Sequence, residues 1–223
     1  MASHGMNRLE EEDEPSAVPK VRAYLIGAIL LVNGFSAMLV FPMAPAMTHH
    51  FFPSLGQEEL GYQAGYLSSV FFFGSFFGAL FWGWACDAFG RRPCLIAGIA
   101  GTLCSVTFFG FSTSFALALV ARFLWGALNG NIGVAKTYMS EICDDSNQAR
   151  GMAIIAAQGG LGRLTGPAVG GFLADPAAQY PALKGIAFFM TFPYALPCLV
   201  GALLAFCCLV GAVISLQAPQ PYP

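Results

Sequence analysis

The chain has 223 residues, of which 57% are hydrophobic and only 10% are charged, and its formal net charge is −2. Soluble domains usually carry about 25% charged residues, so this chain has too little charge to cover a water-exposed surface and is not an ordinary soluble domain. No basic cluster is larger than the pair Arg91–Arg92, which argues against nucleic-acid binding. The seven cysteines have no metal-ligand spacing, so neither a metal site nor a cofactor is predicted.

The sequence divides into two polar ends and a long apolar middle. Residues 1–22 are predicted to form a disordered cytosolic tail, and residues 217–223 a short C-terminal tail. The middle, residues 23–216, contains six apolar stretches of about 20 residues or more, the length that a helix needs to cross a bilayer. These predicted spans lie near residues 23–46, 63–86, 93–112, 115–142, 150–174 and 186–216. The predicted fold class is an all-α, multi-pass membrane protein with six transmembrane helices, because only helices or closed barrels satisfy the backbone in lipid and no strand pattern occurs.

Lysine and arginine in the short connectors predict the orientation, because these residues favour the cytosolic side. One side collects Arg8, Lys20, Arg22, Arg91, Arg92 and Arg150, and the other only Lys184. Both termini are therefore predicted to be cytosolic, while the plasma membrane and the vacuolar membrane stay open alternatives. The first outer connector contains His49, His50, Glu58 and Glu59. Their side chains suit zinc, but a solvated loop is the simpler interpretation.

The connector between the second and third spans has the sequence GWACDAFGRR, residues 83–92. It places small residues at Gly83 and Gly90, an acid at Asp87 and two cations at Arg91 and Arg92. We interpret it as a hinge between two membrane helices. The alternatives are an ordinary surface salt bridge for Asp87 and a topology signal for the two arginines.

The fourth span contains three polar residues at a spacing of seven: Arg122, Asn129 and Lys136. Seven residues are nearly two helical turns, so the three are predicted to share one inward face of the helix. Charges at membrane depth usually face a bundle interior or a wet cavity. The alternatives are that Arg122 extends to the outer interface and that Lys136 extends to the cytosolic one.

The fifth span contains the sequence GLGRLTGPAVGG, residues 160–171. Gly162, Gly166 and Gly170 recur every four residues and form a smooth face against which another helix can pack. Pro167 removes one backbone hydrogen bond and favours a bend. Generic helix packing explains the glycines, but it explains their order with Pro167 and Gly171 less well.

These motifs resemble the Major Facilitator Superfamily. Gly83-x-x-x-Asp87-x-x-Gly90-Arg91-Arg92 is similar to that family's loop between helices 2 and 3, and Arg122-x-x-x-Gly126-x-x-x-Gly130 to its helix 4 motif. Gly162-x-x-x-Gly166-Pro167-x-x-Gly170-Gly171 is similar to the helix 5 motif associated with antiporters. The sequence around these motifs is most similar to that of the zinc-induced facilitator-like group. Two departures are the missing cysteine-rich tail and Arg163, which stands where an apolar residue is expected.

The resemblance implies the N-terminal six-helix half of a twelve-helix fold, built from two inverted three-helix repeats. It also implies that Gly83, Asp87, Gly90, Arg91 and Arg92 form a conformational latch, in which Asp87 meets a helix of the other half. Arg122 is similar to an arginine linked to proton coupling, although no carboxylate lies deep in the six predicted spans.

The expected function is transport of small organic solutes by alternating access, with antiport as the mode and an anionic solute or metal chelator as the cargo. The expected partners are the lipid bilayer and a second half or dimer partner, because the chain stops shortly after the sixth span. The alternatives are a facilitator or symporter of sugar-like nutrients, and a non-transporting membrane protein that binds a full-length relative. An enzyme is not expected, since no nucleophile–base pair, phosphate loop or H-E-x-x-H motif occurs.

Overall fold

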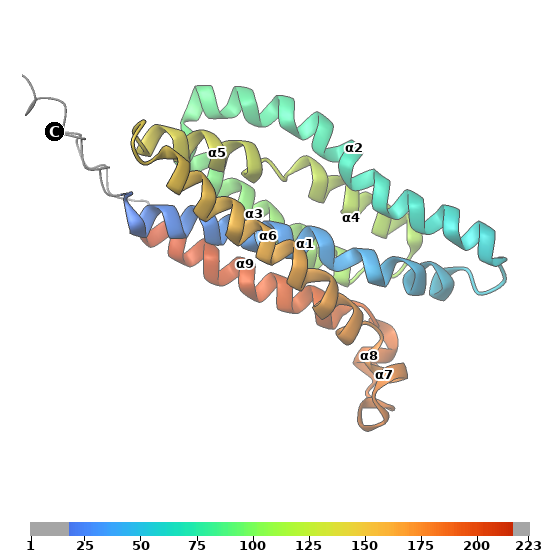
Figure 1. Cartoon of the computed structure of the whole chain (residues 1–223). Coiled ribbons are helices and arrows are strands. Elements are labelled where there is room, and N and C mark those ends of the chain that lie inside the picture. Colours follow the sequence, from blue (N-terminus) through green and yellow to red (C-terminus); the bar gives the residue numbers. More distant parts are fainter. Residues whose placement is uncertain (1–17, 216–223) are drawn as a thin grey trace, which may run out of the picture.

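The computed structural model describes residues 18–215, and all regular structure in that range is helical. Seven longer helices form the bundle in Figure 1: α1 Lys20–Phe51, α2 Gln57–Phe89, α3 Arg91–Gly110, α4 Phe115–Ala127, α5 Asn131–Ile142, α6 Gln148–Leu173 and α9 Ala195–Ser215. Three short elements follow α6 and project from one end of the bundle: α7 Pro176–Gln179, a 3-10 turn at Pro181–Leu183, and α8 Ala187–Thr191. The predicted tails lie largely outside the described residues, except that α1 already begins at Lys20.

Five segments are long and apolar enough to cross a membrane: α1, α2, α3, the stretch Phe115–Ile142 that contains α4 and α5, and α9. The expectation of six such segments is confirmed for five. The remaining helix, α6, has 26 residues and packs along α1, but its seven glycines and the polar side chains of Gln158 and Arg163 lower its hydropathy.

Several helix limits differ from the predicted ones. The first helix continues through Pro42 and Pro45, so His49 and His50 lie in its last turn and not in a loop. The fourth span is interrupted at residues 128–130, where α4 ends and α5 begins. The last long helix begins at Ala195 and not near 186, because residues 192–194, which include Pro193, separate it from α8.

Three pairs of helices have the most extensive contacts: α1 with α6, α2 with α4, and α3 with α9. In the first pair, a Cβ on Gly162 would collide with the carbonyl oxygen of Leu31. In the second, a Cβ on Gly126 would collide with the carbonyl oxygen of Phe71. Glycine therefore allows direct backbone contact in two separate seams, as in closely packed membrane helices.

The buried apolar side chains form two clusters with a polar layer between them. Along α1, Val32 belongs to one cluster and Phe35 to the other, and the buried Asn33 lies between them. Along α3, the buried Thr102 separates Ile99 from Val106 in the same way. The polar layer thus lies near the middle of the long helices, at the depth where a membrane would be least polar.

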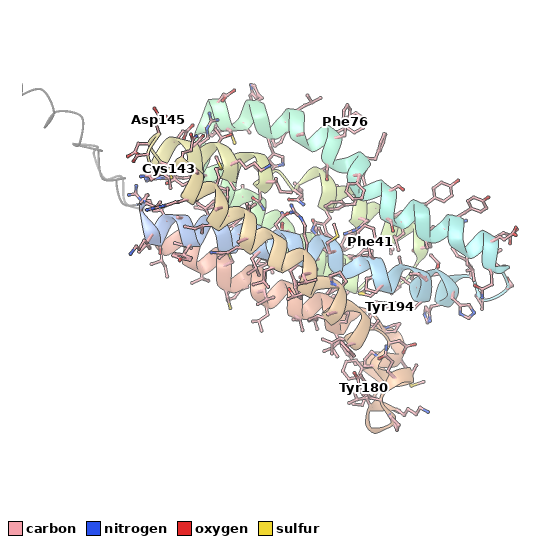
Figure 2. The ribbon with its side chains drawn as sticks, in the orientation of Figure 1. Phe41, Phe76, Cys143, Asp145, Tyr180 and Tyr194 are labelled. Carbon is pink, nitrogen blue, oxygen red and sulfur yellow. The ribbon has the colours of Figure 1, made fainter. Side chains whose placement is uncertain are left out.

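The connectors sort to two ends of the bundle. Figure 1 shows that the start of α1, the α2–α3 junction, the α5–α6 turn and the end of α9 lie at one end. The α1–α2 loop, the α3–α4 loop and the α7–α8 extension lie towards the other end. The large exposed side chains of α2 point outward, as Figure 2 shows for Phe76, which is 66% exposed.

Candidate functional site

The α2–α3 junction is a single residue, Gly90. Its φ of 86° and ψ of 167° lie in a region that glycine adopts and other residues avoid. Most of the predicted connector is therefore helical: Gly83 and Asp87 belong to the last two turns of α2, and Arg91 begins α3. The predicted hinge is shorter than residues 83–92, because Gly90 alone reverses the chain between the two helices.

Arg91 forms two ion pairs at this junction. Its Nη1 lies 2.9 Å from Asp87 Oδ1, and its Nε lies 2.9 Å from Glu141 Oε1 on α5. Arg92 Nε donates to the hydroxyl of Tyr138 at 3.1 Å. The two arginines thus tie the junction to α5. Asp87 is 76% exposed, so much of its carboxylate is available to a further partner.

A groove of about 450 Å³ runs between α2 and α5 from this junction towards the polar layer. Asp87 and Arg91 lie at one end of it, and Asn129 and Gly130 at the other. Gly83 also lines the groove, and a Cβ at this position would meet no atom within 4 Å. Nothing in residues 18–215 therefore requires glycine at position 83.

Arg122 is completely buried between α1, α2 and α4. Its Nη2 donates to the carbonyl oxygen of Ala37 at 2.9 Å, and its guanidinium lies 4.4 Å from the Phe71 ring and 4.9 Å from the Trp125 ring. Its Nε and Nη1 have no hydrogen-bond partner within the described residues. The alternative that Arg122 extends to the membrane interface is wrong, because aromatic rings and the α1 backbone enclose the whole side chain.

Asn129 lies in the break between α4 and α5. Its side chain exchanges hydrogen bonds with the side chain of Asn33, and the donation from Asn129 Nδ2 measures 3.5 Å. Trp82 Nε1 donates to the carbonyl oxygen of Ala127 at 3.0 Å and satisfies one of the carbonyls at the end of α4. These bonds hold the break against α1 and α2. Asn131, which follows the break, is fully buried, and its amide has no hydrogen-bond partner in the part of the chain that the structure describes.

Lys136 is exposed on α5 and lines a second groove, of about 250 Å³, formed with α1 and α6. Arg163 of α6 lines the same groove. Arg122, Asn129 and Lys136 all lie towards α1, where they meet Ala37, Asn33 and the groove lined by Leu30. They differ in environment, because Arg122 is enclosed, Asn129 lies in the break and Lys136 is exposed. Arg163, and not Arg122, shares this groove with Lys136. The sequence marked Arg163 as a basic residue inside the fifth span and as a departure from the family pattern.

The glycines of α6 pack against the α1 backbone. Besides Gly162, a Cβ on Gly166 or Gly170 would collide with the carbonyl oxygens of Phe35 and Leu39, and one on Gly171 would lie 3.8 Å from Pro42 Cβ. Pro167 lies inside α6 without ending it. The corresponding glycines of α2, Gly74 and Gly78, contact the backbone of α4 and were not predicted. Their Gly-x-x-x-Gly spacing in an apolar span is the signal that would have identified them.

The α7–α8 end holds a separate group of polar residues. Asp175 adopts a left-handed conformation, with φ of 44°, and its side chain accepts from the backbone N–H of Ala178. Burial, together with the nearby charge of Asp175, raises the pKa of the Tyr194 phenol. No three His, Cys, Asp or Glu side chains gather as metal ligands anywhere in residues 18–215.

The sequence and the fold both match known proteins. Residues 26–221 match the family described as the Major Facilitator Superfamily. The chain is 33% identical to Protein ZINC INDUCED FACILITATOR-LIKE 1 of Arabidopsis thaliana over 88% of its own length and 41% of the relative's. It is 37% identical to the multidrug transporter mfsB of Aspergillus fumigatus over 89% of its own length and 34% of the relative's.

A crystal structure of a D-xylose–proton symporter superposes with a TM-score of 0.74 at 12% identity, covering 92% of this chain and 49% of that one. A structure of the peptide transporter PepTSo gives 0.68 at 17% identity, covering 93% and 40%. At these identities the likeness concerns the fold alone. The chain spans less than half the length of the relatives that it matches.

Proposed function

The chain belongs to the Major Facilitator Superfamily, and we propose that it moves small organic solutes across a membrane by alternating access, as the N-terminal six-segment half of such a transporter. In this mechanism two bundles rock about a solute held near the middle of the bilayer. The five apolar spans make the chain a multi-pass membrane protein, and we take α6, which packs along α1, as the sixth segment.

The pairing of the helices is the observation on which the proposal rests. With α4 and α5 counted as one segment, the six segments in chain order are α1, α2, α3, α4–α5, α6 and α9. An inverted repeat exchanges the first segment with the fourth, the second with the fifth and the third with the sixth. It therefore converts the α1–α6 pair into the α4–α2 pair. Both pairs are among the most extensive in the bundle, and both have glycine seams. This symmetry is the one expected of two inverted three-helix repeats. It leaves the exposed face of α5, with a groove on each side, for the other half.

The α2–α3 junction suits a conformational latch. Arg91 holds Asp87 and Glu141 together, while most of the Asp87 side chain stays exposed beside the α2–α5 groove. A carboxylate in that position can meet the positive N-terminal end of a helix from the other half. Gly83 lines the same groove and leaves room for such a helix.

Antiport of an anionic solute or metal chelator is the proposed mode. The Gly162–Gly171 motif supports antiport, and two relatives are named a multidrug transporter and an efflux pump. Arg122 has no carboxylate partner among the described residues, so a role in proton coupling requires an acid from elsewhere. The basic residues at the end that contains the α2–α3 junction support a cytosolic location for that end.

Flux measured in proteoliposomes tests the proposal. The whole chain is reconstituted, and uptake of labelled citrate, glucose and lysine is followed with and without an imposed pH gradient. Proton antiport requires that uptake of at least one solute exceed that of empty vesicles and be driven by an acidic interior. Uptake driven by an acidic exterior indicates a symporter. Uptake that ignores the gradient indicates a facilitator. Absence of uptake, together with co-purification of a longer relative from the membrane, indicates a non-transporting partner.

A further inference from the structure

The groove between α1, α5 and α6 contains two cations and no acid. Lys136 and Arg163 line it together with apolar side chains such as Leu30, Ile132 and Ile155. Neither cation forms an ion pair within residues 18–215. Two uncompensated charges in an apolar groove are unfavourable in a membrane protein unless water or an anion reaches them.

Arg163 is held in position by α1. Its Cγ lies next to Gly34, where an added Cβ would be 3.1 Å from this atom and 2.7 Å from the carbonyl oxygen of Gly159. Gly34 adjoins Asn33, whose amide pairs with Asn129 in the polar layer. The aliphatic part of the Arg163 side chain is therefore packed against α1 near the middle of the bundle. The residue as a whole remains exposed.

Lys136 lies nearer to the end of the bundle that contains the α5–α6 turn. It stands nine residues before Asp145 in that turn, whereas Arg163 stands eighteen residues after Asp145. The difference of nine residues corresponds to roughly 13 Å along the helices at 1.5 Å per residue. The two cations thus occupy different depths of one groove.

The start of α5 adds a third positive feature. Gly130 gives α5 no side-chain cap, and the second residue of the helix, Ile132, lines the groove. The first N–H groups of a helix lack intrahelical partners and carry the positive end of its dipole. Broken membrane helices present such ends to anionic groups.

We propose that Lys136 and Arg163 bind the anionic groups of a small organic solute, with Arg163 as the inner contact and Lys136 as the outer one. The inference rests on the proposed transport function and makes it specific. It assigns the anion contact to Arg163 and not to Arg122, whose guanidinium is enclosed by Phe71, Trp125 and the α1 backbone.

Binding measured apart from transport tests the proposal. The purified chain in nanodiscs of neutral phosphatidylcholine is titrated with citrate, malate and glycerol 3-phosphate, and with trimethyl citrate as the uncharged control. We expect at least one of the anions to bind and trimethyl citrate not to bind. Lys136→Gln and Arg163→Gln should each weaken that binding roughly tenfold, the effect of losing one charged hydrogen bond.

Arg150→Gln is the matched control, because it removes the same charge from α6 outside the groove. Arg163→Lys keeps the charge and should retain most of the affinity, which separates loss of the anion contact from misfolding. Repeating the titration in nanodiscs that contain phosphatidylglycerol separates a solute from a lipid headgroup as the source of the anion.

The outcomes are distinct. Three results would each overturn the inference. The first is that none of the anions binds, and the second is that binding survives Arg163→Gln. The third is that phosphatidylglycerol displaces the solute by occupying Lys136 and Arg163. If anion binding depends on Lys136 and Arg163 but no flux is measured, the proposed transport function is wrong and the binding site stands. If flux is measured and neither substitution changes it, the binding site is wrong and the transport function stands.

Discussion

At the scale of single residues, glycine in this bundle has two different roles. Gly162 contacts the α1 backbone, whereas Gly160, two residues earlier on the same helix, has open space where a Cβ would stand. Gly90 adopts a backbone conformation that other residues avoid, whereas Gly83 is an ordinary helical residue. Only the first member of each pair is required by the fold of this chain.

We expect Gly162→Ala to destabilise the bundle by about 1–3 kcal/mol, because the methyl group forces α6 away from α1. Gly160→Ala should be neutral or stabilising by up to about 1 kcal/mol, since it removes backbone freedom without a collision. Denaturant titration of both variants in detergent micelles measures the difference. Equal stabilities would contradict direct backbone contact between α1 and α6.

Gly90→Ala should destabilise the chain by about 1–3 kcal/mol, the range for a residue held in a disfavoured backbone region. Gly83→Ala should change its free energy of unfolding by less than about 0.5 kcal/mol. If Gly83→Ala nevertheless reduces flux, its small size serves contact with another helix. A Gly83→Ala variant that fails to fold would show that residues 83–92 need glycine there for the fold itself.

The role of α6 could be anticipated at this scale, because Gly162, Gly166 and Gly170 recur at the spacing of a helix-packing face. The inward position of Arg122 could also be predicted from its place in an apolar span. Its enclosure by the Phe71 and Trp125 rings could not, because spacing along one span does not identify the aromatic residues that pack against it. Asn33 was also missed, because a single amide in an apolar span has no periodicity to identify it.

At the scale of elements, the interruption of the fourth span decides which side chains face the grooves. The amide pair of Asn33 and Asn129 joins α1 to this interruption, and Trp82 joins it to α2. These contacts bring α5 alongside α1 and α6 with Lys136 outward. Seven-residue spacing predicted the side of the fourth span that meets α1, but it assumed an unbroken helix and so missed the difference in burial between Arg122 and Lys136. The Leu-Asn-Gly sequence at residues 128–130 is too short to signal the break.

A double-mutant cycle measures the contact at the break. Asn33→Val and Asn129→Val should each destabilise the bundle, and their effects should be non-additive by about 0.6–1.7 kcal/mol, the range for hydrogen bonds between membrane helices. Thr137→Val on the exposed face of α5 is the control partner, since its hydroxyl bonds only within α5, to the Gly133 carbonyl. Additive effects of Asn33→Val and Asn129→Val would mean that the amide pair does not join α1 to the break.

At the scale of the whole molecule, two surfaces of the bundle differ in character. The exposed part of α9 is apolar, with Leu203, Phe206 and Val210, whereas the surface of α1, α5 and α6 contains Lys136 and Arg163. The apolar surface of α9 is compatible with contact to lipid, and the charged surface of α1, α5 and α6 is compatible with contact to water. The class of protein and its helical content followed from composition and motif order. Which surface faces the solute depended on packing between segments far apart in the sequence.

Cysteine labelling tests directly whether the surface of α1, α5 and α6 lines an aqueous path. In a cysteine-free background, Ala156→Cys is compared with a restored Cys207, because each residue is exposed and lies eight residues from the helix end nearest the α2–α3 junction. Membrane sheets open on both sides are treated with a maleimide that does not enter the bilayer. We expect rapid labelling of Ala156→Cys and protection of Cys207 by lipid. Equal protection of both positions would contradict the account.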